Sequence, residues 1–449
     1  MSSRGLVGAV LLFALLAACG SKDTSGGRDP DAPGGNGGTG AMGGAFDTAG
    51  ATGGAAGTSI DNPDGDAAVS GGGGEGGRMC GLAGCGQSLT GTGGVVDLLF
   101  VVDSSSSMRE EQESLAREFP RMMRKLTTGD HDEDGTPEYE PIHDLHLGVV
   151  STSLGTVGSY PGCTNNGDSG RLLHSSSTAD CQGPYPTFLT YVDGQDDPEQ
   201  VATDFACLAQ LGIDGCGFEQ PLESALQALW PSADPTIRFL SVDTEGSLGR
   251  GDRDNAGFLR NDPNGQPATL AIVVVTDEDD CSAFETDLWT QSPAPESPYA
   301  MQNLNLRCHY NPDSLYDLER YAVGYRALHG WTGARVLFAA IVGVPVDLVD
   351  QTALAAVDWN DDAQREAHYD KILSDSRMQE VPVETTDATD GLDNLEPSCM
   401  TEHGTAYPPR RIVKLARQFG PNSLVQSICG DNLGPPIEII IRTVLEGPE

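Results

Sequence analysis

The sequence predicts an α/β fold with a mainly parallel central sheet, because short apolar segments alternate with helical patterns from residue 95 onward. The apolar segments are rich in β-branched residues and almost free of polar ones, which is typical of strands buried on both faces. We expect such strands at residues 95–102, 145–151, 270–275, 336–342 and 423–428, with a short edge strand at 186–192. The sheet is therefore expected to carry helices on both faces.

Helical patterns fill most of the connections between these strands. Apolar residues recur at helical spacing at residues 110–126, 200–211, 219–230, 314–329, 410–419 and 437–445. Two segments, 153–196 and 231–268, are instead rich in Gly, Pro, Ser and Asp and are longer than ordinary connections. They are expected to be disulfide-pinned insertions or functional loops of one domain that covers residues 95–449.

The N-terminal segment has the pattern of an export signal. Arg4 precedes an apolar run at residues 6–18 that is too short to span a bilayer and ends at Cys19. The stretch Leu-Ala-Ala-Cys resembles the lipobox of bacterial lipoproteins, which implies removal of residues 1–18 and a lipid anchor on Cys19. Gly20 resembles the sorting pattern of outer-membrane lipoproteins, whereas the periplasmic or outward orientation is not readable. An ordinary secretory signal or an uncleaved membrane helix are the alternatives.

The next segment has the composition of a flexible tether. Residues 20–94 hold 27 of the 57 glycines of the chain, with Ala, Ser, Thr and Asp making up most of the rest. Such a segment buries too little apolar surface to offset the entropy lost on ordering. Residues 19–94 are therefore expected to connect the lipid anchor to the folded domain.

The chain is strongly acidic, with 66 Asp and Glu against 26 Lys and Arg and a formal net charge of −40. A surface of this sign repels nucleic acid and anionic lipid and favours divalent cations or basic partners. Nucleic acid is thus excluded as a partner, and the only membrane contact expected is through the lipid anchor. Solubility outside the cytoplasm is the alternative, and it alone would account for most of the acidity.

The ten cysteines beyond Cys19 form an even set in an exported chain and predict disulfides. Sequence alone does not determine their connectivity. A zinc site is the alternative, but no Cys-x-x-Cys spacing and no histidine pair accompanies the cysteines. Close spacing suggests the pairs Cys80–Cys85, Cys163–Cys181, Cys207–Cys216 and Cys281–Cys308, which leaves Cys399 for Cys429.

Oxygen-bearing side chains follow two of the expected strands. Asp103, Ser105 and Ser107 come directly after the strand at 95–102, and Asp277 follows the strand at 270–275. Ligands of open α/β sheets bind at the carboxyl ends of strands, so we expect these residues to lie together. One or two carboxylates with hydroxyls and water suit Mg²⁺. Helix capping by Ser and Asp is the alternative, although one cap requires only one such residue.

This pattern resembles the von Willebrand factor type A domain and its metal-ion-dependent adhesion site. The stretches GCGFEQPLESAL, NAGFLR, VVVTDEDDCS and VQSIC further resemble cysteine-bearing members of this family among bacterial lipoproteins. The resemblance covers most of residues 95–446 and implies that Asp103, Ser105, Ser107 and Asp277 bind a divalent cation directly or through water. The family usually adds a threonine where this chain has Glu219. Either Glu219 replaces that oxygen, which would favour Ca²⁺ or Mn²⁺ over Mg²⁺, or it only interacts with the helix N-terminus.

A second acidic segment resembles the first half of a calcium loop. Asp130, Asp132 and Asp134 stand at alternate positions before Gly135, but the twelfth position is Pro141 and no EF-hand helix pair flanks the segment. A different calcium-binding turn closed by Glu138 or Glu140, or a solvated acidic loop, are the two interpretations.

Together these patterns predict a lipid-anchored, exported protein that is not an enzyme. Its type A domain would bind a partner protein through a divalent cation whose coordination shell a partner carboxylate completes, at the cell envelope. The tether would raise the local concentration of domains at the membrane. A structural scaffold with a degenerate metal site is one alternative. The other is a metal-dependent hydrolase at the acidic cluster 276–280, for which the sequence shows no convergent base or nucleophile.

Overall fold

The computed structural model of the protein describes residues 94–160, 163, 167–260, 268–383, 394–401 and 404–446. The expected signal peptide and almost all of the expected tether lie outside these residues, as do Cys19, Cys80 and Cys85. The predictions for these segments therefore stay predictions.

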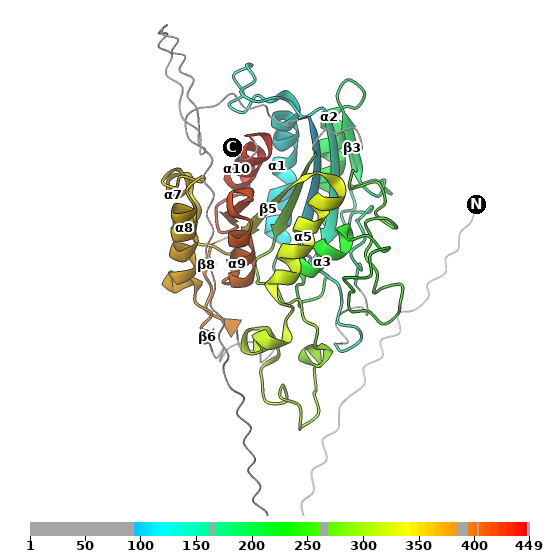
Figure 1. Cartoon of the computed structure of the whole chain (residues 1–449), viewed down its shortest axis with the longest axis vertical. Helices are drawn as coiled ribbons and strands as arrows, with labels where there is room; N and C mark the ends of the chain where they lie inside the picture. The colour runs from blue at the N-terminus through cyan, green and yellow to red at the C-terminus, as the bar shows by residue number, and fades with distance from the viewer. Residues whose placement is uncertain are drawn as a thin grey trace, which may run out of the picture. The chain divides into compact units, whose positions relative to one another are not determined.

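The described residues form an α/β fold around a six-stranded sheet, as the sequence predicts (Figure 1). The strand order is β3-β2-β1-β4-β5-β10, and all neighbours are parallel except β2 and β3. The strands are β1 (Val95–Val102), β2 (Asp144–Ser151), β3 (Leu189–Val192), β4 (Thr269–Val275), β5 (Arg335–Val342) and β10 (Ser423–Ser427). The antiparallel β3 lies at the edge, where the short strand was expected.

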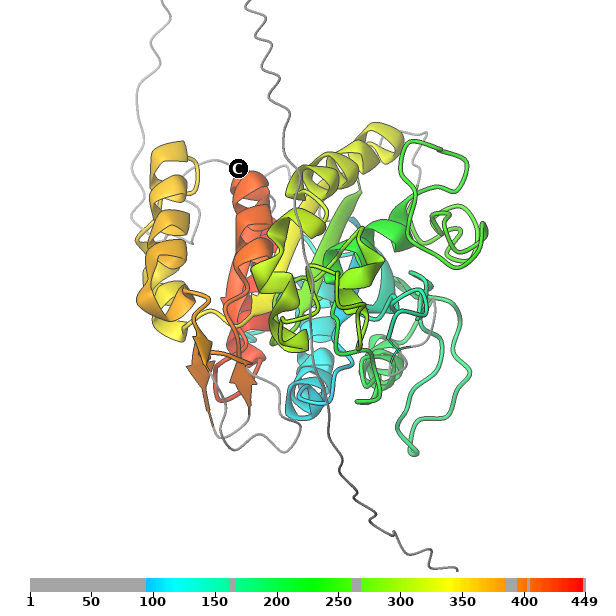
Figure 2. The ribbon, with the colours of Figure 1, turned by 90° about the horizontal axis from the view of Figure 1, so that it is seen from below.

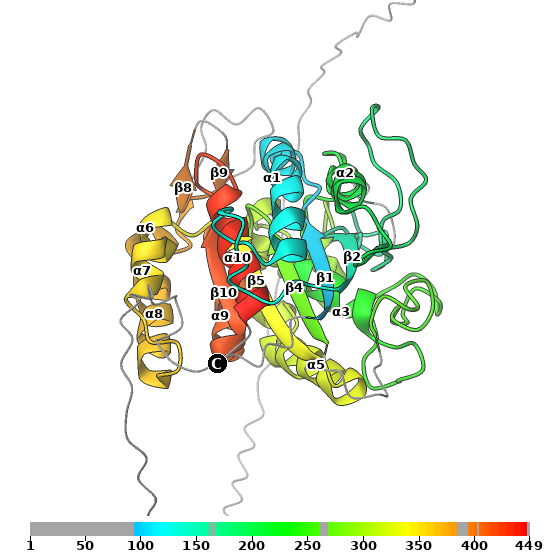
Figure 3. The ribbon, with the colours of Figure 1, turned by 90° about the horizontal axis from the view of Figure 1, so that it is seen from above.

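Helices cover both faces of the sheet, which Figure 3 shows from above. In β1, Phe100 packs edge-on against Phe119 on one face, with the ring centroids 5.4 Å apart, whereas Leu99 belongs to the core on the other face. Both faces of the strand are thus buried, which explains why its sequence does not alternate between polar and apolar residues. The first face is covered by α1 (Arg109–Thr128), α2 (Pro198–Leu208) and α10 (Gly434–Glu446), and the second by α3 (Pro221–Leu229), α5 (Leu318–Thr332) and α9 (Arg410–Gln418).

The C-terminus of α1 is set by Gly129. Its backbone is left-handed, with φ of +69°, and its N–H donates to the Lys125 carbonyl at 2.9 Å. A Cβ at this position would lie 2.2 Å from the Tyr139 carbonyl oxygen. Only glycine fits here, so the chain leaves the helix sharply and enters the acidic segment that follows.

Several short elements between β5 and α9 were not predicted from the sequence. They are α6 (Val346–Val349), α7 (Gln351–Ala355), α8 (Asp362–Ser374) and the short strands β6 (Pro382–Val383), β7 (Asn394–Leu395), β8 (Cys399–Met400) and β9 (Thr405–Ala406). Figure 2 shows α8 outside the layer that contains α9, against which it packs. Its buried side chains include Arg365 and His368 beside Tyr369 and Ile372, so it has no clear apolar stripe.

The segment between β4 and α5 consists of short helical turns instead of one long connection. They are η1 (Thr286–Trp289), η2 (Leu304–Leu306), α4 (Arg307–Tyr310) and η3 (Pro312–Ser314). In Figure 1 this yellow-green segment lies at the lower end of the view, near β6 and β8. Among the described residues, no helix is both long enough and apolar enough to cross a membrane.

Four disulfides join the described cysteines, and they correct part of the expected connectivity. The predicted pairs Cys281–Cys308 and Cys399–Cys429 are confirmed. The predicted pairs Cys163–Cys181 and Cys207–Cys216 are wrong, because the bonds are Cys163–Cys216 and Cys181–Cys207. Each described cysteine of the insertion thus bonds to a cysteine of α2 or of the loop after it. The pairing confirms that disulfides pin the insertion at 153–196, and disulfides of this number are typical of exported proteins.

A buried ion pair fixes the second insertion to the sheet. Asp97 of β1 is fully buried, and its carboxylate accepts from Nε of Arg260 at 2.7 Å and from the Arg260 backbone N–H at 3.0 Å. Burial raises the pKa of Asp97, and the Arg260 guanidinium opposes this rise. Arg260 therefore compensates a charge that the interior would otherwise disfavour.

We expect Arg260→Ala to lower the free energy of unfolding by about 3–5 kcal/mol, because it leaves Asp97 buried with only His146 beside it, at 3.5 Å, and burial lowers the pKa of His146. Urea unfolding followed by circular dichroism measures this change. The matched control is Arg171→Ala, which breaks a half-exposed ion pair with Asp254 and should cost less than about 1 kcal/mol. Equal losses in both variants would contradict the role given to Arg260.

Candidate functional site

The two polar segments that the sequence singles out meet at the carboxyl ends of β1 and β4. These strands are neighbours, with Val102 opposite Val275. Beyond them, the backbone N–H of Asp103 donates to the Val275 carbonyl at 3.0 Å. The chain runs from β1 through α1 to β2, which pairs with one side of β1, whereas β4 pairs with the other side of β1. The strand order therefore changes direction at β1, which makes this edge a topological switch point. Such points are the usual ligand-binding positions of open α/β sheets.

Asp103 is held in one orientation by three neighbours. It is fully buried, and its Oδ1 accepts from the Ser105 N–H at 2.7 Å, while its Oδ2 accepts from the Thr276 hydroxyl at 2.7 Å. Thr152 contributes a longer contact to Oδ1 at 3.4 Å. The Ser105 and Ser107 hydroxyls lie 3.1 Å apart beside it. These oxygens form one small cluster at the end of β1.

The serines do not cap the helix that follows them. The N-cap residue of α1 is Met108, and no side-chain hydrogen bond caps this helix. The interpretation of the serines as caps is therefore wrong. Their hydroxyls instead lie with Asp103 at the edge of the sheet.

Asp277 lies close to this cluster and lacks a partner for one of its oxygens. Only 2% of Asp277 is exposed, and its Oδ1 accepts no hydrogen bond from the described residues. Burial raises the pKa of Asp277 well above its usual value, and repulsion from Asp103 and Glu278 raises it further. The Ser107 hydroxyl opposes this rise. A buried carboxylate of this kind is costly unless a cation offsets its charge.

Glu219 reaches the same edge from the loop before α3. It is buried, its Oε1 accepts no hydrogen bond from the described residues, and Gln220 occupies the N-cap position. Burial raises the pKa of Glu219 well above its usual value, followed by repulsion from Glu278 and Asp103. Glu219 therefore lies close enough to Asp103 for the two carboxylates to repel each other.

Two further carboxylates of the site were not predicted from the sequence. Glu111, in the first turn of α1, is 7% exposed with an unpartnered Oε2, and burial raises its pKa to about 7, with repulsion from Glu110 and Asp103 adding to the effect. Burial likewise raises the pKa of Glu278 to about 7. An acid in the first turn of a helix ordinarily interacts with the helix dipole, so the sequence gave no signal for Glu111. The run 276–280 did provide a signal for Glu278.

Five carboxylates thus lie at this edge of the sheet, but they do not form one compact group. They belong to Asp103, Glu111, Glu219, Asp277 and Glu278. Within the described part of the chain, groups of three or more carboxylates with oxygens within 4.8 Å of one another occur only elsewhere. A cation at this edge would thus be bound by hydroxyls and water as well as by one or two carboxylates, which suits Mg²⁺.

Two disulfides flank the site. Cys216, three residues before Glu219, bonds to Cys163, and Cys281 at the end of the run 276–280 bonds to Cys308. The backbone closes in as well, because the Gly215 N–H donates to the Ser104 carbonyl at 2.8 Å. A Cβ on Gly215 would lie 2.2 Å from the Ser104 hydroxyl. The loop that carries Glu219 is thus fixed against the loop that carries the serines.

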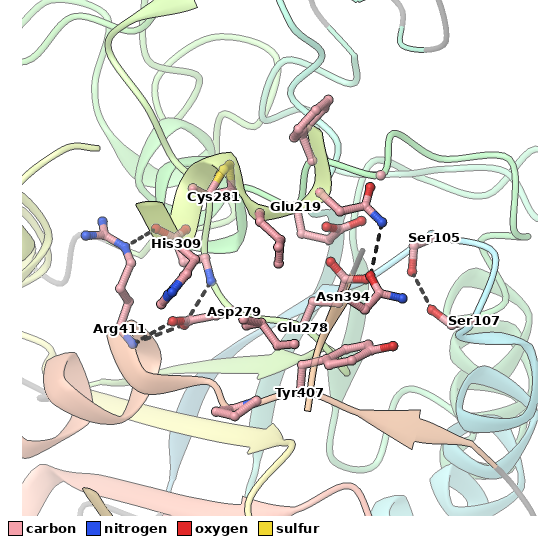
Figure 4. Close-up of a pocket in the computed structure, with 18 of the residues that line it drawn as sticks. Ser105, Ser107, Glu219, Glu278, Asp279, Cys281, His309, Asn394, Tyr407 and Arg411 are labelled. Carbon is pink, nitrogen blue, oxygen red and sulfur yellow. Dashed lines mark hydrogen bonds and ion pairs between the residues drawn. A yellow bond between two sulfur atoms is a disulfide. The ribbon is translucent and has the colours of Figure 1, made fainter. Parts of the chain in front are cut away.

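A cavity of about 290 Å³ opens beside the cluster (Figure 4). Ser105 and Ser107 lie on one side of it, and Arg411 on the other. Arg411 lies in the first turn of α9 and pairs with Asp280 at 3.2 Å. The site therefore combines a group of carboxylate and hydroxyl oxygens with an adjoining cavity.

The second acidic segment is assembled at the other end of α1. Carboxylate oxygens of Asp130, Asp132, Asp134 and Glu138 all lie within 4.8 Å of one another. Glu138, and not Glu140, is thus the residue that closes the group. Asp130 also accepts from the Asp134 and Gly135 N–H groups at 3.1 and 2.8 Å. The geometry is compatible with both interpretations of this loop.

Comparisons with known proteins add little to this geometry. No protein-family model matches the chain, and no curated protein matches its sequence. Among solved structures, the pilus adhesin SpaC from Lactobacillus rhamnosus GG in its open conformation is similar over 78% of this chain, with 10% identity and a TM-score of 0.32. A second crystal form of SpaC is similar over 55% of this chain, with 12% identity and a TM-score of 0.25. The chain spans only 30% and 25% of these two chains. Similarity this low carries no argument about function.

We expect Glu111→Gln to stabilise the cation-free protein increasingly as the pH rises. The pKa of Glu111 is raised from 4.5 to about 7, so the folded state binds more protons than the unfolded state between these pH values. Stability from this group is present below pH 4.5 and is lost as the pH rises through about 7. Melting temperatures of both proteins at pH 4.5 and pH 8, with a chelator present, test this: the difference should favour the variant only at pH 8. A constant difference would contradict it.

We expect the acidic loop to bind Ca²⁺ in preference to Mg²⁺, because its oxygens are exposed and adjustable. Asp132→Asn with Asp134→Asn should abolish this binding in a calorimetric titration and leave the site at β1 and β4 unchanged. Calcium uptake by the double variant equal to that of the unaltered protein would favour the solvated-loop interpretation.

Proposed function

We propose that this exported protein binds a partner protein through a divalent cation at the carboxyl edge of β1 and β4. Asp103, Ser105, Ser107 and Asp277 would be its ligands, directly or through water, and Glu219 would supply the oxygen that a threonine provides in the type A family. The observation that supports this most strongly is the buried, unpartnered Oδ1 of Asp277 beside Asp103. The strand order and the position of the cluster at the switch point also support it.

The charge of the site favours cation binding over an unoccupied scaffold. Burial raises the pKa of Asp103, Asp277 and Glu219, so each of these carboxylates is disfavoured in its charged form without a counter-ion. A divalent cation would remove that penalty, and its affinity should rise as the carboxylates lose their protons. A carboxylate at position 219 adds negative charge compared with threonine, which favours Mn²⁺ or Ca²⁺ beside Mg²⁺.

The chain's own residues prepare the site for a carboxylate from the partner. Thr276 and the Ser105 N–H orient Asp103, so its carboxylate does not have to reorganise when a cation arrives. The hydroxyls of Ser105 and Ser107 are neutral, so they add no further negative charge around the ion. The bound ion would supply an electrophilic position that the partner's carboxylate completes. This is binding without chemical turnover, and we propose no catalytic residue.

The proposed setting is the cell envelope. The predicted lipid on Cys19 would anchor the protein, and residues 19–94 would let the domain search for partners near the membrane. A structural scaffold remains the second candidate function, because the usual threonine is replaced by Glu219.

We expect the full chain, stripped with a chelator, to bind Mg²⁺ or Mn²⁺ at one site that both Asp103→Ala and Asp277→Ala weaken by at least about 100-fold. Even residues that only orient metal ligands contribute about 10–100-fold to affinity, so loss of a ligand should cost at least as much. Isothermal titration calorimetry measures the affinity and number of sites. Capture of any carboxylate-bearing partner should then be abolished by the same chelator.

The matched control is Asp132→Asn, which removes one carboxylate from the acidic loop and should leave this site unchanged. Glu219→Thr should retain binding and shift the preference toward Mg²⁺. A folded protein that takes up neither Mg²⁺, Mn²⁺ nor Ca²⁺ at this edge would favour the scaffold.

A further inference from the structure

The four acids that follow β4 divide between two kinds of contact. Asp277 and Glu278 belong to the carboxylates at the edge of the sheet, and Asp277 is a proposed ligand of the ion. Asp279 and Asp280 instead accept hydrogen bonds from the first turns of two helices. The proposed function gives these last two acids no role, although they lie two and three residues after a proposed ligand.

Asp279 binds the N-terminus of α9, as the dashed lines to Arg411 in Figure 4 show. Its Oδ2 accepts from the Arg411 N–H at 2.9 Å, and its Oδ1 accepts from the Ile412 N–H at 3.3 Å. The N-cap residue of this helix is Pro409, which makes no side-chain cap. Asp279 therefore supplies, from a distant part of the chain, the acceptor that a helix N-terminus needs.

Asp280 is buried and joins the same turn to α3 and to Arg411. Its Oδ1 accepts from the Leu222 N–H at 3.2 Å, in the first turn of α3, a helix whose N-cap residue also makes no side-chain cap. Its Oδ2 accepts from Nε of Arg411 at 3.2 Å, and Nη2 of Arg411 donates to the Tyr316 carbonyl at 2.7 Å. Arg411 thus connects the turn to the start of α5 as well.

A third link reaches Asp277 itself. The Tyr407 N–H donates to the Asp277 carbonyl at 2.8 Å, so residues 407–412 contact three of the four acids. This segment is packed closely on the end of β5, because a Cβ on Gly343 would lie 2.4 Å from the Tyr407 carbonyl oxygen. The Cys399–Cys429 disulfide holds the short strands just before it. The segment is therefore a fixed support for the turn.

We propose that Asp279 and Arg411 are positioning residues that hold the turn bearing Asp277 in place and so set the affinity of the ion site. Neither residue would touch the ion. Oδ1 of Asp277 accepts no hydrogen bond from the described residues, so links to the backbone of the turn carry much of its positioning. The inference rests on the proposed function for the ion, whereas the position of the turn is measurable without one. Residues that orient metal ligands contribute strongly to metal affinity.

The first experiment compares Asp279→Ala with Asp279→Asn in calorimetric titrations of Mg²⁺ into the full chain, stripped with a chelator. Both variants remove the same negative charge, but only asparagine keeps an oxygen that accepts from the N–H groups of α9. We expect the alanine variant to bind Mg²⁺ about tenfold more weakly than the unaltered chain, and the asparagine variant less than about threefold more weakly. Equal weakening in both would overturn the proposal, because it would show an effect of charge alone.

The second variant, Arg411→Ala, separates positioning from charge by the sign of its effect. Loss of a positive charge near the site should by itself strengthen the binding of a cation. Loss of the contacts to Asp280 and Tyr316 should instead loosen the turn, so we expect weaker Mg²⁺ binding. Unchanged or stronger binding would overturn the role given to Arg411. If Asp279→Ala does not fold, this variant decides alone.

The matched control is Asp361→Ala, which removes an acid that caps another helix. Asp361 is exposed and accepts from the Ala363 N–H at 2.8 Å and the Gln364 N–H at 3.3 Å, at the start of α8. This variant should lower the melting temperature and leave the affinity for Mg²⁺ unchanged. A loss of affinity equal to that of Asp279→Ala would overturn the proposal, because it would then reflect stability or net charge.

A further experiment measures the turn without an ion. In the full chain labelled with ¹⁵N-tyrosine and kept in chelator, nuclear magnetic resonance follows hydrogen exchange of the Tyr407 N–H, which donates to the Asp277 carbonyl. Exchange should be about tenfold faster in Asp279→Ala and close to that of the unaltered chain in Asp279→Asn. Unchanged exchange in Asp279→Ala would overturn the proposal. If exchange responds as expected but the unaltered chain takes up no divalent cation, the proposed function fails and the positioning of the turn stands.

Discussion

Negative charge buried at the ends of β1 and β4 is the constraint on which the rest of the site depends. A carboxylate that leaves water must gain hydrogen bonds or a counter-charge, or it becomes protonated. Asp103 gains hydrogen bonds from Thr276 and Ser105, whereas Asp277 and Glu219 each keep an oxygen without a partner. At the opposite edge of the same sheet, Asp97 shows how the fold treats a purely structural acid, because Arg260 pairs with it directly. The contrast supports the proposal that a cation offsets the charge at the β1 and β4 edge.

The scaffold around this edge is held by covalent and backbone links rather than by a large core. The third apolar cluster is small and contains Cys163, Cys216 and Cys281 beside Trp289 and Phe218. Disulfides restrict the unfolded chain and so stabilise loops that bury little apolar surface. The loop bearing Glu219 and the segment after β4 can therefore present charged groups in fixed positions. This solution is available to exported proteins, since disulfides persist outside the reducing cytoplasm.

The sequence identified the main sheet and the two strand ends that form the candidate site, because both leave local signals. Uninterrupted β-branched runs mark buried strands, and the residues directly after them must lie at the carboxyl edge. The pairing of Cys163 with Cys216 left no such signal, because the two cysteines are 53 residues apart and are brought together only by tertiary structure. Helix α8 was missed because Arg365 and His368 interrupt its buried face. Glu111 was missed because its burial depends on the packing of α1, which its position in sequence does not reveal.

The negative charge of the site also limits how an acidic partner can bind to it. A single divalent cation offsets two of the five formal negative charges of the cluster, and an acidic side chain from a partner adds one back. Each further charge that the site keeps must be balanced at short range, since the surrounding surface is acidic as well. Burial raises the pKa of both Glu219 and Glu278, so protonation or a nearby cation must offset their charge. An acidic partner is therefore expected to bind here only after a cation has offset part of this charge.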